Sequence, residues 1–142
     1  MRLPADATLI VVGDSGGAGR EDAAAKVAAL KAAWRREELP ALDIGAGGFA
    51  GGRLEASLDD LGATTLVLCG EQGAVEAAAR DAAALGFHAF LVRDACWRAA
   101  GAPQDAFAPR PEDGGAVVDA AATLAAAALA KARQRREARR PR

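Results

Sequence analysis

Residues 64–96 read as a strand, a helix and a second strand, and this pattern limits the possible folds more than any other feature. Thr65–Cys69 and His88–Val92 are short apolar runs of the kind found in buried strands. Between them, the alanine-rich segment from about Ala74 to Leu85 predicts a helix that ends at Gly86. Two strands joined by such a helix run parallel, with a right-handed crossover. The stretch therefore predicts an α/β fold built on a parallel sheet.

The rest of the chain continues this alternation. Strands are predicted at 8–12 and 41–44, helices at 21–38, 53–61 and 116–136, and a short helical turn at 95–100. We therefore expect a three-layer sandwich with a short parallel sheet and a Rossmann-type topology. Residues 1–112 are expected to form the α/β core, and residues 113–142 a C-terminal helix with a basic tail.

The composition favours one domain with a thin core. The chain has 142 residues, which is enough to bury a core without disulfides or metals. Half of the residues are hydrophobic, but the bulk of these are alanines, and only four Phe and two Trp supply large aromatic side chains. Helices are then expected to pack closely on small side chains. This composition often accompanies burial of part of the surface in an oligomer, so a homo-oligomer is expected.

The two cysteines and the lack of long apolar runs predict a cytoplasmic protein. Cys69 and Cys96 follow strands and give no disulfide framework. No apolar run approaches the roughly 20 residues needed to span a bilayer, so no membrane contact is expected. The N-terminus lacks the charged and then apolar pattern of a signal peptide.

Charge is concentrated at the C-terminus. Residues 131–142 hold seven basic residues and one acid, a net charge of +6 that leaves −7 on residues 1–130. Cations at a helix C-terminus suit the helix dipole, and a solvated helix end is the favoured interpretation. A contact with an acidic partner or nucleic acid is the alternative. Because no aromatic residues are interleaved and no recognition motif is present, nucleic acid is not the expected partner.

Glycine-rich loops follow the first three predicted strands and hold eleven of the sixteen glycines. These loops lie at the carboxyl ends of the strands, where open α/β sheets bind ligands. Glycine there serves either close approach to a ligand or a tight turn, and both interpretations stay open. Ala18 and Gly19 break the P-loop pattern, and Asp22 breaks G-x-G-x-x-G. One histidine and two cysteines at no ligand spacing predict no metal site, and no cofactor is expected.

Several of these segments resemble the isochorismatase-like cysteine hydrolases. The strand Leu66–Gly70, the helix motif Ala79–Ala82 and the strand end Val92–Ala95 are similar to the family's strand, helix and Asp-Ala segments. FAGGRL at 49–54 and ATLIVVGD at 7–14 resemble two further family segments. The resemblance implies the family's fold and a hydrolase of C–N or C–O bonds. It also implies a catalytic triad of Asp, Lys and Cys.

The triad positions depart from the family pattern. The nucleophile position falls on Ala74, and alanine cannot attack a carbonyl group. Leu42–Ala46 occupies the region of the catalytic lysine, and the lysines of the chain are all placed on predicted helices. The opening acid matches Gly13, or Asp14 if the register slips by one. Cys69 matches a residue inside the sheet, so no catalytic residue is predicted.

The sequence therefore predicts a family member that has lost the hydrolase triad. It is expected to act as a small-molecule-binding or structural subunit, in homo-oligomers or with an active relative. The residues expected to contact a ligand are Asp14, Ser15, Gly48, Phe49, Gly70, Glu71, Gln72, Gly73 and Ala74. One alternative is an active hydrolase of a small amide or ester that recruits Asp14, Ser15 or Cys96. Another is an adaptor that uses the Arg-rich tail.

Overall fold

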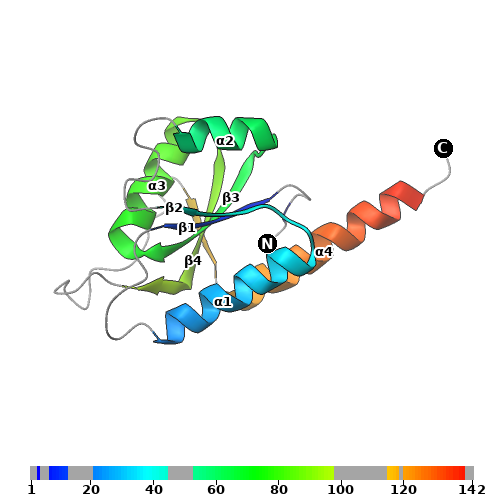
Figure 1. Ribbon diagram of the computed structural model, residues 1–142, viewed down its shortest axis with the longest axis horizontal. Coiled ribbons are helices and arrows are strands. Elements are labelled where there is room, and N and C mark those ends of the chain that lie inside the picture. The colour runs from blue at the N-terminus through cyan, green and yellow to red at the C-terminus, as the bar shows by residue number, and fades with distance from the viewer. Residues whose placement is uncertain are drawn as a thin grey trace.

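Five strands and four helices alternate along the chain (Figure 1). The computed structural model describes residue 3 and residues 7–12, 21–44, 53–97, 115–118 and 120–139, and the structural findings concern these residues. The elements are β1 (Thr8–Val12), α1 (Glu21–Arg36), β2 (Ala41–Ile44), α2 (Arg53–Leu61), β3 (Thr65–Glu71), α3 (Gln72–Ala84), β4 (His88–Trp97), β5 (Gly115–Val118) and α4 (Ala120–Arg139).

The strands form one parallel sheet in the order β2-β1-β3-β4-β5. Helices α1 and α4 cover one face of the sheet, and α2 and α3 cover the other. This confirms the predicted α/β sandwich of three layers. In this strand order the direction of winding reverses between β1 and β3, and the crevice for a ligand in such sheets lies at the carboxyl ends of those strands.

The core consists of two apolar layers, one on each face of the sheet. Leu9 and Val11 of β1 point toward α1 and α4, and Ile10 and Val12 point toward α2 and α3, as the two-residue period of a strand requires. Trp34 of α1 is fully buried in the first layer and donates its indole N–H to the carbonyl oxygen of Ala7 at 3.0 Å. Most other helix residues in both layers are alanines, so the helices lie close to the sheet.

Helix α1 ends where the backbone of Glu38 takes a left-handed conformation, with φ of 57°. Pro40 follows and cannot donate a helical hydrogen bond, and its carbonyl oxygen accepts instead from the backbone N–H of Leu9. The chain thereby passes from α1 into β2 and pairs with β1 at once. The sequence predicts a helix over 21–38, and the structure ends it two residues earlier, at Arg36.

The region around the β3–α3 connection differs from the sequence prediction. Strand β3 continues two residues further than expected, and α3 starts at Gln72 rather than near Ala74. The helical turn predicted at 95–100 is wrong for its first three residues, because β4 continues to Trp97. Cys96 and Trp97 pair with Gly70 and Glu71, after a shift in register between Leu68 and Gly70. Pairing with a longer β3 therefore decides the conformation there.

Strand β5 was missed. The last helix was predicted from about residue 116, whereas Gly115–Val118 pairs with β4 at the edge of the sheet and α4 begins at Ala120. Four residues directly before an alanine run are too few to show a helical or strand periodicity in the sequence. Pairing with β4 decides that this segment is a strand. The segment from residue 113 onward thus supplies a strand to the sheet as well as the last helix. Among the described residues, no helix is long and apolar enough to cross a membrane.

Candidate functional site

The β3–α3 connection stands at the carboxyl edge of the sheet and holds all five of the described ligand-contact candidates. Gly70 pairs with Val12 of β1 on one side and with Cys96 of β4 on the other. Strand β3 ends at Glu71 and α3 begins at the next residue, so the candidates from 70 to 74 form one continuous segment. The four other candidates, Asp14, Ser15, Gly48 and Phe49, lie outside the described residues.

Gly70 is required by the backbone of its neighbouring strand. Its φ is +126°, a conformation that residues with a side chain rarely adopt. A Cβ atom at this position would lie 2.1 Å from the carbonyl oxygen of Val12. Close pairing of β1 and β3 therefore explains this glycine without any ligand.

Ala74 is the residue that the sequence resemblance aligns with the family's nucleophile. Its side chain is 8 % exposed and belongs to the apolar layer between the sheet and α2 and α3, together with Val12 and Val75. A methyl group in that layer can pack against its neighbours but cannot attack a carbonyl carbon.

The first turn of α3 lacks a side-chain cap. Glu71 stands at the N-cap with φ of −69° and ψ of 125°, and its side chain makes no capping hydrogen bond. A Cβ atom at Gly73 would meet nothing within 4 Å, so this residue faces open space. Backbone N–H groups at the start of a helix need partners, and the helix dipole favours a negative group there. This turn can therefore bind a carboxylate or phosphate.

Both cysteines are free thiols, Cys69 buried and Cys96 half-buried, and both are hard to ionise. Cys69 is fully buried in β3, as predicted, and burial raises the pKa of its thiol strongly. Cys96 lies within β4 rather than in a loop, and its Sγ donates to the carbonyl oxygen of Val92 at 3.2 Å. Burial raises the pKa of Cys96 to about 12, although a backbone hydrogen bond with Gly70 opposes the shift. Because the thiolate is the nucleophilic form, both groups are inert at neutral pH.

The described lysine side chains are paired with carboxylates on the opposite face of the sheet from Ala74. Lys31 lies 2.9 Å from Asp43 of β2, and Lys26 lies 3.8 Å from Asp94 of β4. Asp94 also accepts a hydrogen bond from the backbone N–H of Ala120 at 2.8 Å, and so caps α4. Both lysines belong to α1, and the sheet separates them from the β3–α3 segment.

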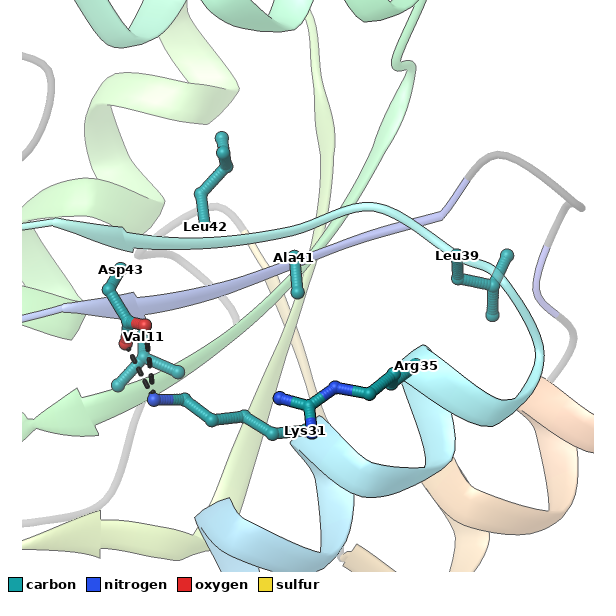
Figure 2. Close-up of a pocket in the computed structure, with 7 residues that line it drawn as sticks. All are labelled: Val11, Lys31, Arg35, Leu39, Ala41, Leu42 and Asp43. Atoms are coloured by element: carbon teal, nitrogen blue, oxygen red, sulfur yellow. Dashed lines mark hydrogen bonds and ion pairs between the residues drawn. The ribbon is translucent and has the colours of Figure 1, made fainter.

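A groove of about 360 Å³ runs between α1 and the edge strand β2 (Figure 2). Lys31 and Arg35, one helical turn apart, point along it beneath the strand, and Asp43 pairs with the lysine. Val11, Leu39, Ala41 and Leu42 complete its lining. None of the predicted ligand contacts lines this groove. The spacing of Lys31 and Arg35 was the available signal, but their approach to β2 depends on the tertiary fold.

The described residues show no metal centre. In this part of the chain, no three His, Cys, Asp or Glu side chains gather closely enough to hold a metal ion. His88 is exposed at the start of β4, at the other end of that strand from Cys96. The two residues therefore do not form a catalytic pair.

Residues 42–123, more than half of the chain, match the isochorismatase domain. The chain belongs to the isochorismatase family. The match covers the β3–α3 segment and all of β4, where the sequence resemblance was strongest. No curated protein matches the chain in sequence.

Solved isochorismatase structures share the fold. An isochorismatase-family protein from Chromobacterium violaceum is 20% identical with a TM-score of 0.74, over 91% of this chain and 97% of that one. An isochorismatase-family protein from Burkholderia thailandensis is 21% identical with a TM-score of 0.71, over 89% and 98%. N-carbamoylsarcosine amidase from Thermoplasma acidophilum is 18% identical with a TM-score of 0.66, over 81% and 96%. The predicted isochorismatase-like topology is thus confirmed, with a fold that hydrolases share.

Proposed function

We propose that this isochorismatase-family chain does not carry out the family's cysteine hydrolysis and acts as a small-molecule-binding or structural subunit. The observation that carries the proposal is the side chain of Ala74, a buried methyl group at the nucleophile position. The family reaction needs a sulfur there, beside a lysine and an acid that the matching segments of this sequence do not supply in register.

The separation of the remaining reactive groups supports this proposal. Ala74 packs on the α2 and α3 face of the sheet, while Lys26 and Lys31 lie on the other face in ion pairs. The thiol of Cys69 is buried and that of Cys96 is half-buried, and the pKa values of both are raised. Nucleophilic catalysis needs an activated group within hydrogen-bond reach of a base. The described residues bring no such pair together.

The proposed ligand site is the carboxyl edge around the first turn of α3. The first-turn backbone N–H groups, which the side chain of Glu71 does not cap, suit a small molecule with a carboxylate or phosphate group. Asp14, Ser15, Gly48 and Phe49 follow the neighbouring strands in sequence and are the proposed further contacts. Two free thiols also fit the reducing cytoplasm that the sequence predicts.

An active hydrolase with a different nucleophile is the second candidate. Cys96 favours it, because this thiol lies beside Gly70 at the carboxyl edge and a backbone hydrogen bond with that glycine lowers its pKa. Burial outweighs this hydrogen bond, which is why we place the candidate second. The adaptor role of the Arg-rich tail ranks third, since Arg135 already pairs with Glu37 and Arg133 donates to the carbonyl oxygen of Leu3.

A turnover assay separates the candidates. The full chain is incubated with a panel of small amides and esters, alongside Cys96→Ala and the matched Cys69→Ala. We expect no turnover above that of buffer for any of the three. Sustained turnover by the native chain that is lost only in Cys96→Ala would replace the proposal by the second candidate. Salt-sensitive DNA binding that disappears when residues 131–142 are deleted would promote the third.

A further inference from the structure

Strand β2 forms one edge of the sheet, and part of its backbone faces outward. In the strand order β2-β1-β3-β4-β5, β2 has a neighbour on one side only. The backbone N–H of Leu9 donates to the carbonyl oxygen of Pro40 at 3.0 Å, and Leu9 is in register with Ala41. In a parallel ladder the backbone groups of successive residues point to alternate sides of the strand. The N–H and carbonyl groups of Ala41 and Asp43 therefore point away from β1.

These outward groups of Ala41 and Asp43 have no hydrogen-bond partner within the described parts of the chain. An edge strand in this state is a template for pairing with a further extended chain. Some proteins use this property to bind a peptide as an added strand. The backbone bonds then give affinity, and pockets for alternate side chains give specificity. The surroundings of β2 therefore decide which peptide fits.

On the side of α1, an added strand would meet the groove beneath β2. Ala41 presents only a methyl group to this groove, and the guanidinium group of Arg35 extends beneath the strand there (Figure 2). Among the described residues, Arg35 has no ion-pair partner, whereas the charge of Asp43 is balanced by Lys31 at 2.9 Å. The charged side chains of the groove thus have a net charge of +1. A carboxylate beside Ala41 would complement that charge.

On the opposite side of β2, the surroundings are apolar. Leu42 and Ile44 are partly buried and pack against the core layer beneath α2 and α3. Neighbouring strands lie about 4.8 Å apart, so alternate side chains of an added strand would stand beside these two residues. Apolar side chains there would remove the remaining apolar surface of Leu42 and Ile44 from water. The fitting strand is therefore apolar on one face and carries an acid on the other.

We propose that the open edge of β2 binds an extended peptide segment of a partner protein, in which apolar and polar residues alternate and an acidic residue stands beside Ala41. The peptide backbone bonds to Ala41 and Asp43, and the carboxylate pairs with Arg35. The apolar side chains cover Leu42 and Ile44. The inference does not depend on the proposed function, because β1 lies between β2 and the β3–α3 segment.

Titration calorimetry of the full chain with blocked heptapeptides tests the proposal. The peptides TVEVTVT and TVQVTVT differ only in the residue designed to stand beside Ala41. We expect the first to bind with a dissociation constant on the order of 0.1 mM, because the contact is smaller than a standard interface. The second should bind about threefold more weakly, as is usual for loss of an exposed ion pair. No binding of TVEVTVT at about 1 mM would overturn the proposal.

Variants of Arg35 test the charged contact. Arg35→Gln should bind both peptides equally, because the carboxylate loses its partner. The matched variant Arg36→Gln should keep the preference for TVEVTVT, since Arg36 is not among the residues that line the groove. A preference for TVEVTVT that persists in Arg35→Gln would contradict the proposed position of the acid.

Variants of Ala41 test the backbone contact. Ala41→Pro removes an outward N–H and leaves the hydrogen bonds with β1 in place, because the N–H of Ala41 does not face β1. It should weaken the binding of both peptides about fivefold. Ala41→Ser keeps the N–H and should bind as the native chain does. Circular dichroism shows whether each variant is folded, and equal binding by folded Ala41→Pro and Ala41→Ser would contradict strand addition.

Hydrogen exchange followed by NMR separates strand addition from simple charge attraction in the native chain. The amide protons of Ala41 and Asp43 should exchange rapidly in the free chain. An excess of TVEVTVT should slow both about fivefold, while the amide of Leu42, which faces β1, should change little. Binding that protects neither Ala41 nor Asp43, or that affects only residues 131–142, would overturn the proposal, because the peptide would then lie elsewhere.

Discussion

The β3–α3 segment and helix α1 differ in the kind of contact that each makes with the sheet. At the β3–α3 segment the backbone of Gly70 packs closely against that of Val12, and Ala74, which the resemblance aligns with the nucleophile, is a buried methyl group. Helix α1 carries Lys26 and Lys31, but both lysines form ion pairs with carboxylates of the strands. The comparison teaches that one region is set by close backbone packing and, in our proposal, lacks a reactive side chain. The other keeps cations that serve as structural contacts.

The largest effect is expected at Gly70. Gly70→Ala would place a Cβ atom 2.1 Å from the carbonyl oxygen of Val12 in a backbone conformation that alanine rarely adopts. We expect the free energy of unfolding to fall by at least about 3 kcal/mol, or the chain not to fold. Urea unfolding measures this. Gly73→Ala, three residues on in α3, should be neutral or stabilising by about 1 kcal/mol. Similar losses in both variants would show that the two glycines do not differ as described.

The buried hydrogen bond from Trp34 to Ala7 ties α1 to the start of β1, and a variant of Trp34 tests its strength. Trp34→Phe removes the indole N–H that bonds to the carbonyl oxygen of Ala7 and reduces the buried volume. We expect a loss of about 2 kcal/mol in the free energy of unfolding, because a buried acceptor is left without its donor. Thermal unfolding monitored by circular dichroism checks this. A change below about 0.5 kcal/mol would mean that water replaces the indole.

Asp94 makes two contacts, a helix cap at Ala120 and an ion pair with Lys26, and their contributions to stability can be compared. Asp94→Ala should cost about 1 kcal/mol, because α4 loses the cap at Ala120. Lys26→Met removes only the longer contact of 3.8 Å, at a lysine side chain that is 49% exposed, and should change stability by less than about 0.5 kcal/mol. Equal losses in the two variants would show that the ion pair, rather than the cap, carries the effect.

No effect on activity is expected when a thiol is placed at position 74. Ala74→Cys puts a thiol at the nucleophile position, but the lysines remain on the other face of the sheet. The variant should stay folded, with a change of about 1 kcal/mol or less in stability, and should gain no amide hydrolysis. Turnover by this variant would show that the missing sulfur alone separates this chain from an active enzyme.

The sequence predicted the architecture where side chains alternate clearly. The first three strands, α1 and α2 were placed well, because β-branched and apolar residues stand between glycines and prolines there. The extension of β4 to Trp97 and the strand β5 could not be read, since pairing with distant residues decides them. Alanine hides such boundaries because it suits both a helix and a packed strand.

The candidate site was predictable only in part. Alignment of the helix motif at 79–82 placed Ala74, and the structure shows that residue in the core. The groove beside β2 was missed, because Lys31 and Asp43 are brought together by the fold and not by their spacing. Asp14, Ser15, Gly48 and Phe49 stay predictions.

The central claim is that the folded chain presents no activated nucleophile, and covalent labelling tests it without knowledge of a substrate. Burial raises the pKa of Cys96 from 9.0 to about 12, so its thiol stays neutral below pH 9 and ionises in the native chain only as the pH approaches 12. Because the thiol ionises at about pH 9 in the unfolded chain and about pH 12 in the folded chain, its contribution to stability is lost as the pH rises from about 9 to about 12.

The native chain is treated at neutral pH with a chloroacetamide and, separately, with a fluorophosphonate, and its intact mass is measured by mass spectrometry. The account predicts an unchanged mass, with thiol labelling only after unfolding in urea. Rapid single labelling of the folded chain at Cys96, or of a hydroxyl such as that of Ser15, would contradict it.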